Sequence, residues 1–323
     1  MCTEKLMTIS TIRPQANAVL MVRPCHFFSN PQTAASNRFQ GQSVLSKKEQ
    51  QSRAIKEFDN FVIILKAAGI EVIQFDDTAI PETPDAIFPN NWVSFHHNGS
   101  VVIYPMEAKN RRTERRIDII DALSMHYNFQ VTETLNLTHY EKHDKFLEGT
   151  GSMVMDHNNR IIYACRSSRT NLEVVSDLSK KLNYSTITFD ATDRFGDPIY
   201  HTNVMMSVGN KLAIICLDTI NLIEEKNSLL KSLKANNTEV LLLSIPQMEA
   251  FAGNMLALES SSGEPLLVMS EQAKESLDEK QIICIEKYAK IISAPLNSIE
   301  ASAGGSARCM LAEIYLPKKE NVK

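Results

Sequence analysis

Several signatures that mark whole classes of proteins are missing from this sequence. Its 323 residues contain no apolar run long enough to span a bilayer, and no basic segment followed by an apolar one of the kind that predicts a signal peptide. The 34 basic and 38 acidic residues give a formal net charge of −4, without the basic excess typical of nucleic-acid binding. We therefore expect a cytoplasmic protein whose partners include neither a membrane nor a nucleic acid.

Metal-binding and disulfide patterns are missing as well. The six cysteines are scattered, with no Cys-x-x-Cys pair and no spacing with histidine that suits zinc. This favours a reduced compartment and predicts no metal site. His96 and His97 stand beside a turn signal and are expected at the surface. The arginine run from Arg111 to Arg116 is expected on the solvated face of a helix.

What the sequence does contain is a repeated unit. Each unit reads as two apolar strands joined by a turn, followed by a helix and a further strand. The strand pairs are expected at residues 91–95 with 101–104, 152–155 with 161–164, 203–206 with 212–215, and 254–258 with 266–269. The helices are expected at residues 112–127, 171–182 and 224–234, and the closing strands at 129–132, 185–189 and 239–243.

The two ends of the sequence complete this pattern. Residues 308–316 form an apolar segment without a following partner, and residues 18–22 form one without a preceding partner. The helix after residues 18–22 begins at a capping box, Ser46 to Glu49. Pairing the two segments closes a ring of five units with a period of about 50 to 60 residues, which is typical of a propeller or a solenoid-like array. The alternative is chance similarity within an ordinary α/β protein.

In such a ring, the first residues of the units surround one axis. These residues are Asn91, Ser152, Asn203, Asn254 and Cys309. Three further polar residues stand just upstream of unit starts and fall beside them, namely Asp85, Glu148 and His201. A thiol, an imidazole and carboxylates then share one pocket, where they supply a nucleophile, a base and a group that orients the base.

The cysteine has its own local signal. Cys309 follows a small-residue loop, in which glycines allow close approach of the backbone to a ligand, and Arg308 helps to hold a thiolate. Each candidate also has a plainer interpretation. Cys309 can be a buried core cysteine, His201 a satisfied buried histidine, and Glu148 an ordinary loop carboxylate.

Five segments resemble signatures of the guanidine-modifying superfamily, which includes arginine deiminases, dimethylarginine dimethylaminohydrolases and amidinotransferases. They are residues 84–92 (PDAIFPNNW), 147–151 (LEGTG), 168–171 (SRTN), 201–203 (HTN) and 304–310 (GGSARCM). The resemblance runs from about residue 23 to residue 310 and is strongest to the bacterial citrulline-utilisation hydrolase branch. It implies one catalytic domain over residues 1–323 with an α/β fold, the five-bladed propeller of ββαβ modules called a pentein, around a central active-site channel.

The resemblance also implies a role for each candidate. Cys309 matches the nucleophile, His201 the general acid/base and Glu148 its carboxylate partner, with no metal or other cofactor. Asp85 matches a residue that contacts the amino-acid end of the substrate. Arg169 matches an arginine that grips the substrate carboxylate, for which a guanidinium fork is suited.

The sequence departs from the arginine-processing relatives at two positions. Those relatives clamp the guanidinium with two carboxylates, and the matching residues here are Asn91 and Asn203. A buried guanidinium without counter-charge is costly, whereas an asparagine amide donates to a carbonyl oxygen and accepts from an amide. This favours a neutral ureido group such as that of citrulline, with Asn91 and Asn203 as substrate-binding residues.

Other interpretations stay open at this point. Asp85 or Glu148 can neutralise a guanidinium, or the match can slip to Asp193 or Asp197. The predicted function is hydrolysis of a C–N bond in a small guanidino or ureido amino acid through a covalent cysteine intermediate. An amidinotransferase or an arginine deiminase would use the same chemistry. A function of another class, that of a non-catalytic binding protein, also stays open, because a ribosome-binding translation factor has a similar fold. Assembly into a homodimer stays open as well.

Overall fold

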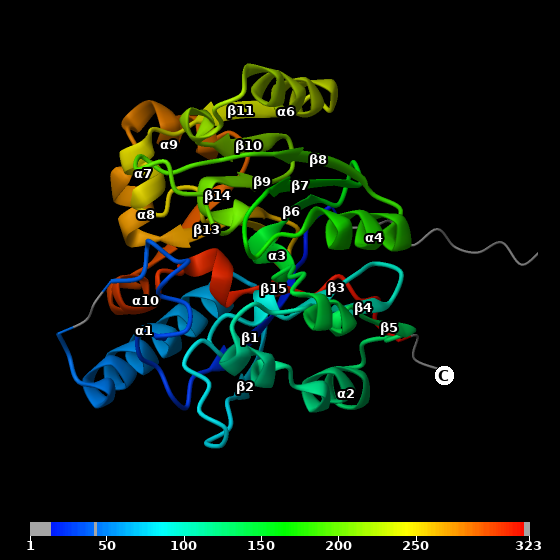
Figure 1. The fold of residues 1–323 in the computed structure, drawn as a ribbon, viewed down its shortest axis with the longest axis vertical. Helices are drawn as coiled ribbons and strands as arrows, with labels where there is room; N and C mark the ends of the chain where they lie inside the picture. Colours follow the sequence, from blue (N-terminus) through cyan, green and yellow to red (C-terminus); the bar gives the residue numbers. More distant parts are fainter. Residues whose placement is uncertain (1–13, 42–43, 320–323) are drawn as a thin grey trace, which may run out of the picture.

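The computed structural model describes residues 14–41 and 44–319 (Figure 1). Within these residues, the strands form five sheets of three strands each. The sheets comprise β15 (Ala312–Glu313), β1 (Ala18–Arg23) and β2 (Glu71–Asp76); β3 (Val93–Phe95), β4 (Ser100–Ile103) and β5 (Glu133–Asn136); β6 (Val154–Asp156), β7 (Ile161–Cys165) and β8 (Ser185–Phe189); β9 (Met206–Val208), β10 (Leu212–Ile215) and β11 (Glu239–Leu242); β12 (Leu256–Glu259), β13 (Pro265–Ser270) and β14 (Lys290–Ala294). The protein is therefore a mixed α/β fold built from small sheets.

Every sheet follows the same pairing rule. Its middle strand runs antiparallel to the first strand and parallel to the third. In the third sheet, β7 pairs antiparallel with β6 through Tyr163 and Val154, and parallel with β8 through Ile161 and Ser185. An antiparallel pair needs only a tight turn, whereas a parallel pair needs a longer crossover, which each sheet makes with helix. The repeated unit that the apolar pattern predicts is present.

The first and last described strands meet in one sheet, as predicted. β15 pairs antiparallel with β1, with Val19 opposite Glu313 and Leu20 opposite Ala312. Figure 1 shows these two strands next to each other near the centre of the molecule. The first unit therefore takes one strand from each end of the sequence.

Helices form the crossovers between the second and third strands. They are α1 (Lys47–Ala67), α2 (Ile117–Met125), α4 (Leu172–Leu182), α6 (Ile223–Ala235), and in the fifth sheet α8 (Glu271–Ser276) with α9 (Glu279–Glu286). Polar caps fix where they begin. Ser46 and Glu49 form the predicted capping box of α1, and the Asn171 side chain accepts from the backbone N–H groups of Glu173 and Val174 in α4.

Short helical turns fill the remaining connections. They are η1 (Pro89–Asn91), η2 (Lys109–Glu114), η3 (Thr138–His143), α3 (Gly149–Ser152), α5 (Thr202–Met205), η4 (Leu217–Thr219), α7 (Ile245–Glu249), α10 (Asn297–Ala303) and η5 (Ala307–Met310). Asn91, Ser152 and Asn203 therefore lie on turns ahead of β3, β6 and β9, and the expectation that they begin strands is wrong. A strand would send alternate residues to opposite faces, whereas these turns bury consecutive polar residues.

The expected helix over residues 112–127 is also wrong in extent. η2 ends at Glu114, and α2 begins only at Ile117 because the intervening Arg115 and Arg116 have extended backbone. Arg111 in η2 is 2% exposed, so it does not lie on a solvated face. A buried charge requires counter-charges, and the acidic partners of Arg111 are described below.

The closing strand expected at residues 129–132 lies further along the chain, as β5 (Glu133–Asn136). The prediction began at Phe129 because this residue is apolar, and its side chain is indeed buried. It lies ahead of the strand, however, where its backbone forms an isolated bridge with Lys318. The residues of β5 itself are mostly exposed and polar, so they carry no apolar alternation.

His96 is buried at 4% exposure, which corrects the expectation that it lies at the surface. Its Nε2 lies 2.8 Å from Ser94 Oγ, and its ring packs near that of His157. Burial, together with the neighbouring charge of His97, lowers the pKa of His96 to about 3. This histidine is therefore neutral at physiological pH and acts as a packed aromatic ring.

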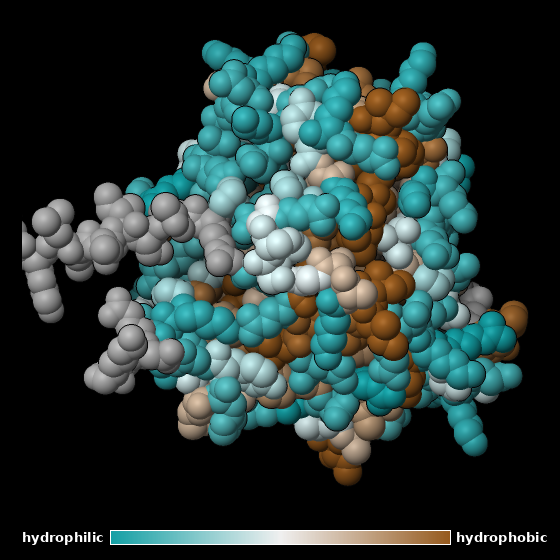
Figure 2. All heavy atoms as spheres, turned by 180° about the vertical axis from the view of Figure 1, so that it is seen from behind, coloured by the Kyte–Doolittle hydropathy of each residue, from teal (hydrophilic) through white to brown (hydrophobic). Residues whose placement is uncertain are grey.

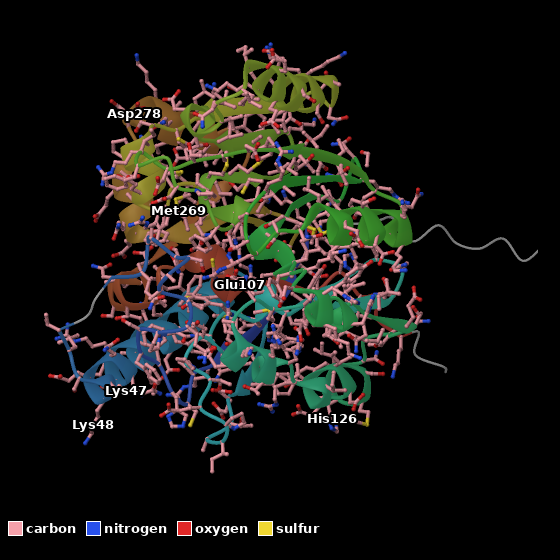
Figure 3. The ribbon with its side chains drawn as sticks, in the orientation of Figure 1. Lys47, Lys48, Glu107, His126, Met269 and Asp278 are labelled. Carbon is pink, nitrogen blue, oxygen red and sulfur yellow. The ribbon has the colours of Figure 1, made fainter. Side chains whose placement is uncertain are left out.

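The surface shows where the polar and apolar side chains gather. On the face seen in Figure 2, a band of hydrophobic residues runs between hydrophilic ones. Figure 3 shows Lys48, His126 and Asp278 toward the outline of the molecule, whereas Glu107 falls near the middle of the view. None of the described helices combines the length and apolar character needed to cross a membrane.

Candidate active site

Four of the short helical turns meet at one place. η1 contacts α3 and η5, and α3 contacts α5. Asn254, just ahead of β12, joins this group, because its Nδ2 donates to the backbone oxygen of Asn203 at 3.0 Å and lies 3.3 Å from Cys309 Sγ. These contacts gather the residues that were predicted to begin the five units.

Cys309 lies in η5 and is 4% exposed. The Nδ2 atoms of Asn203 and Asn254 lie 3.6 Å and 3.3 Å from its Sγ. Two amide donors at this distance stabilise a sulfur anion. The loop before Cys309 is held closely: Gly304 has a φ of +63°, and a Cβ on it would lie 2.4 Å from the backbone nitrogen of Gln40.

His201 and Glu148 form a buried pair. His201 Nε2 lies 2.9 Å from Glu148 Oε2. Burial lowers the pKa of His201 to about 4, although Glu148 opposes that shift. Burial alone would raise the pKa of Glu148, but Arg169 and His201 outweigh it and hold the pKa well below its usual range. At neutral pH, a neutral imidazole therefore donates from Nε2 to a carboxylate, which leaves Nδ1 as the proton acceptor.

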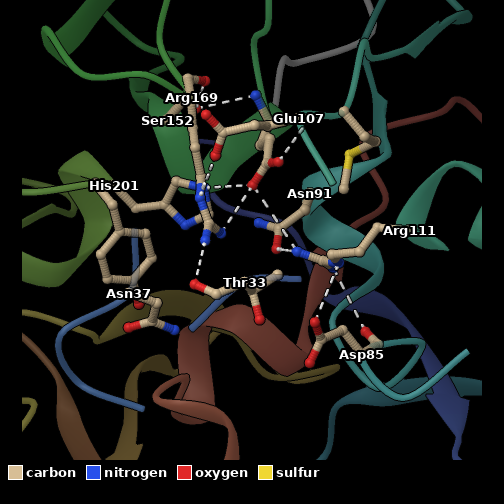
Figure 4. Close-up of polar contacts among 12 residues, drawn as sticks. Thr33, Asn37, Asp85, Asn91, Glu107, Arg111, Ser152, Arg169 and His201 are labelled. Carbon is tan, nitrogen blue, oxygen red and sulfur yellow. Dashed lines mark hydrogen bonds and ion pairs between the residues drawn. The ribbon is translucent and has the colours of Figure 1, made fainter. Parts of the chain in front are cut away.

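Arg169 lies in the turn between β7 and α4, where its guanidinium is buried (Figure 4). Its Nη1 is 3.3 Å from Glu148 Oε2, and its Nε is 3.3 Å from Glu107 Oε2. Its Nη2 donates to the backbone oxygen of Thr33 at 3.3 Å and to Ser36 Oγ at 2.7 Å. These last two partners are neutral, and a substrate carboxylate is a stronger partner for a guanidinium than either of them.

Arg111 is a residue of this site that sequence reasoning missed. It grips Glu114 with its Nε 3.0 Å from Oε1 and its Nη2 2.9 Å from Oε2, and its Nη1 donates to Asn91 Oδ1 at 2.9 Å. Its Nε also lies 3.6 Å from Asp85 Oδ2 (Figure 4). The same oxygen accepts a hydrogen bond from Asn30 Nδ2 at 2.7 Å. Burial opposes the charge, but Glu114 and Asp85 outweigh it and raise the pKa of Arg111. The spacing of Arg111 and Glu114 by three residues was the only signal, since it places both on one side of a helical turn.

Asn91 and Asn203 each keep one buried polar atom without a hydrogen-bond partner among the described residues. These atoms are Nδ2 of Asn91 and Oδ1 of Asn203. The other end of each amide is engaged, by Arg111 and by Cys309 respectively. Asn91, which lines the cavity described next, therefore offers a ligand one free donor, and Asn203 has one free acceptor beside Cys309.

A small cavity lies among these side chains. Of the seven predicted site residues, five line it: Asp85, Asn91, Arg169, His201 and Cys309. The other two, Glu148 and Asn203, lie behind His201 and Cys309 and contact them. The cavity volume of about 20 Å³ leaves room for about one water molecule.

The two alternative aspartates lie away from this cavity. Asp193 Oδ1 accepts from the backbone N–H groups of Phe195 and Asp197, which closes a turn. Asp197 pairs with Arg38. Neither carboxylate is placed to clamp a group beside Cys309. Over residues 14–41 and 44–319, no three histidine, cysteine or acidic side chains are grouped so as to hold a metal ion.

Solved structures share the fold at low sequence identity. ArgZ, an arginine dihydrolase from the ornithine–ammonia cycle in cyanobacteria, is 17% identical over 94% of this chain, with a TM-score of 0.72. DDAH from Pseudomonas aeruginosa, in a complex with citrulline, is 12% identical over 93% of this chain and 100% of its own length, with a TM-score of 0.61.

The similarity to ArgZ spans only 42% of that enzyme, that is, about two fifths of its length. It spans 99% of the N-terminal domain of ArgZ, in a variant covalently bound to a reaction intermediate, with 17% identity over 93% of this chain and a TM-score of 0.71. This similarity therefore concerns one domain of the longer enzyme.

Sequence comparison gives the family. No curated protein sequence matches the chain. Residues 23–316 match the family model described as N,N dimethylarginine dimethylhydrolase, eukaryotic. Because this match spans most of the sequence, the chain belongs to the N,N dimethylarginine dimethylhydrolase family.

Proposed function

We propose that this protein is one catalytic domain that hydrolyses a C–N bond in the guanidino or ureido group of an amino acid, with a preference for a ureido group such as that of citrulline. In this proposal, the five sheets are the blades of a propeller around the cavity. The observation that carries it is the His201–Glu148 pair, buried at the same cavity that Cys309 lines. A nucleophile, an acid/base and a group that orients it are what covalent hydrolysis requires.

The first half of the reaction forms a covalent intermediate. His201 Nδ1 takes the proton of the Cys309 thiol, and the thiolate attacks the central carbon of the ureido group to form a C–S bond. The tetrahedral adduct then collapses, and the bond from that carbon to the substrate's Nδ atom breaks. His201 gives its proton to this nitrogen, which leaves as the amine of ornithine when the substrate is citrulline. A carbamoyl group remains on the sulfur.

The second half releases that group. Water replaces the amine, His201 Nδ1 removes one of its protons, and the resulting hydroxide adds to the carbamoyl carbon. The C–S bond breaks, carbamic acid leaves and decomposes to carbon dioxide and ammonia, and the sulfur regains its proton from His201. Glu148 stabilises the imidazolium in both halves, because its carboxylate accepts from Nε2.

Substrate binding follows from the charges around the cavity. Arg169 binds the carboxylate and Asp85 the ammonium group of the amino-acid end. The reacting end meets two neutral amides, Asn91 and Asn203, where a guanidinium would need carboxylates. Entry of an amino acid requires the segment that carries Thr33 and Ser36 to move, because the cavity holds about one water molecule in this conformation.

A product assay tests this function. The purified protein is incubated with citrulline, arginine, agmatine and methylated arginines, and ornithine, citrulline and ammonia are quantified. Ornithine from citrulline supports the proposal, and a carbamoyl adduct on Cys309 identified by mass spectrometry supports its covalent step. Citrulline and ammonia from arginine would show a deiminase and contradict the ureido preference. Full activity of Cys309→Ala would overturn the mechanism.

Two other outcomes remain distinct in that assay. An amidinotransferase shares the chemistry up to the covalent intermediate. It would then transfer the group to an acceptor amine, which has to be added to the assay. A non-catalytic binding protein would give no product with any member of the panel. The joint presence of Cys309, His201 and Glu148 at one site favours the enzyme over the binding protein.

A further inference from the structure

Arg111 is a buried guanidinium whose role the proposed reaction leaves open. It is 2% exposed and lines the cavity. Its Nε and Nη2 grip Glu114 of the same turn, at 3.0 Å and 2.9 Å. Because these two donors already bind a carboxylate, Arg111 cannot offer a second pair of parallel N–H groups to a substrate carboxylate. Its remaining nitrogen, Nη1, donates to Asn91 Oδ1 at 2.9 Å.

That bond decides which way the Asn91 amide points. If the amide turned over, its NH2 group would face the N–H groups of Arg111, donor against donor. The oxygen therefore stays with Arg111, and Nδ2 stays free and buried beside the cavity. A carboxylate at this position would have no such direction, since both of its ends accept.

We infer that Arg111 is a positioning residue that fixes the hydrogen-bond polarity of the site and thereby selects a ureido group over a guanidinium. Asn91, which lines the cavity, offers N–H to a carbonyl oxygen. A ureido group carries that oxygen, whereas a guanidinium has only donors and meets a donor at Asn91. The inference rests on the proposed function for its choice of ligands.

The other buried arginine of the cavity, Arg169, also has two carboxylate partners, Glu107 and Glu148, but it differs from Arg111 at Nη2. Arg169 holds two neutral partners, Thr33 and Ser36, which a carboxylate can displace. Arg111 has no comparable neutral partner to give up except Asn91 and the backbone oxygen of Asp85, at 3.5 Å. The two guanidiniums therefore have different roles. Arg169 faces the amino-acid end of the substrate, and Arg111 orients the Asn91 amide, which meets the reacting end.

Binding to the Cys309→Ser protein tests this role without turnover. Dissociation constants for citrulline and arginine are measured by calorimetry in that background and with Arg111→Lys, Asn91→Asp or both added. A lysine keeps the charge beside Glu114 but cannot hold Glu114 and Asn91 together. We expect Arg111→Lys to reduce the preference for citrulline about tenfold, the effect of one buried hydrogen bond.

The double variant isolates the pair. Asn91→Asp keeps a partner for Arg111 and replaces the free donor with an acceptor, so we expect citrulline to lose and arginine to gain at least about tenfold. Adding Arg111→Lys to Asn91→Asp should leave the ratio of the two dissociation constants within about twofold, because a carboxylate has no polarity to fix. Arg115→Lys is the matched control: Arg115 is on the adjoining segment and pairs with Glu141 outside the cavity, and its replacement should leave the ratio unchanged.

Three results would overturn the inference. In the first, Arg111→Lys weakens citrulline and arginine equally at unchanged melting temperature, which would make Arg111 a ligand of the shared amino-acid end. In the second, the two substitutions change the ratio additively. In the third, the Cys309→Ser protein binds neither ligand. If the expected ratios are found but the unsubstituted protein turns over neither compound, the polarity stands and the proposed hydrolysis fails.

Discussion

Glu148 Oε2 accepts from His201 Nε2 at 2.9 Å while it also lies 3.3 Å from Nη1 of Arg169. One carboxylate oxygen thus serves the acid/base and the guanidinium that faces the other end of the cavity. Nη1 of Arg111 lies 3.9 Å from the same oxygen. Loss of this negative charge therefore disturbs proton transfer and substrate binding together.

The substitution Glu148→Gln tests that shared role. Glutamine keeps the shape of the side chain but cannot stabilise the imidazolium, so we expect kcat to fall by about two to four orders of magnitude. We also expect KM to rise, since Arg169 loses one of its two charged partners. Steady-state kinetics with citrulline measures both. The matched control is Glu141→Gln, which removes the partner of Arg115 away from the cavity and should leave both parameters unchanged.

The pH dependence of the reaction follows from His201. Its pKa in the folded protein is lowered to about 4, mainly by burial, from an ordinary value of 6.5. The imidazole must be neutral to take the thiol proton, so we expect the acid limb of kcat/KM to fall near pH 4. A pH profile of kcat/KM with citrulline measures this limb. A limb near pH 6.5 would contradict a buried neutral histidine.

Much of the fold could be predicted because each unit carries its own apolar pattern. The strand β8 lies at the predicted residues 185–189, and α1 begins at the predicted capping box of Ser46 and Glu49. β5 could not be found this way, because its residues are mostly exposed and polar, and the buried Phe129 drew the prediction toward an earlier segment. Pairing of β15 with β1 was predictable only because both were left without partners.

The candidate site was predictable as a set of residues but not as an arrangement of charge. Cys309, His201 and Arg169 have reactive or charged side chains and stand in segments that resemble family signatures. Arg111 was missed because an arginine in a run of arginines is typical of a surface, and its three-residue spacing to Glu114 does not indicate that the pair is buried together with Asp85. The direction of the Asn91 amide depends on that contact, so the sequence alone leaves it undetermined.

Gly151 allows the turn α3 to pack closely against Asn91 and His201. A Cβ at this position would lie 2.5 Å from Asn91 Nδ2 and 2.8 Å from His201 Nδ1. We expect Gly151→Ala to displace both side chains and lower kcat/KM by about a hundredfold, as small misplacements of reacting groups do. Gly263→Ala is the control: its Cβ meets nothing within 4 Å, and although its φ of +85° strains the turn between β12 and β13, that turn does not line the cavity. Equal kinetics of the two variants would show that the contact is relieved elsewhere.

Arg169→Lys separates the amino-acid end from the reacting end. A lysine cannot form the two-pronged bond to a carboxylate, so we expect KM for citrulline to rise about tenfold to a hundredfold with a smaller change in kcat. Agmatine lacks the carboxylate and provides an internal control. Any binding or turnover of agmatine should be nearly unaffected. An equal loss with both compounds would instead indicate that the substitution acts through Glu148.

Glu300 provides a test of stability that is independent of catalysis. It is 2% exposed and accepts from Ser306 Oγ at 2.5 Å, behind the loop that carries Cys309. Burial raises the pKa of Glu300 to about 7, above the ordinary value of 4.5. The protonated carboxyl therefore contributes its full share of folding stability below about pH 4.5, and this stability is lost as the pH rises through about 7. Glu300→Gln cannot ionise, and we expect it to gain about 1 kcal/mol or more relative to the unsubstituted protein between pH 5 and pH 8. Melting temperatures at both pH values measure this, with the half-exposed Glu264→Gln as the control. A difference that is the same at both pH values would show that Glu300 is already ionised in the folded protein.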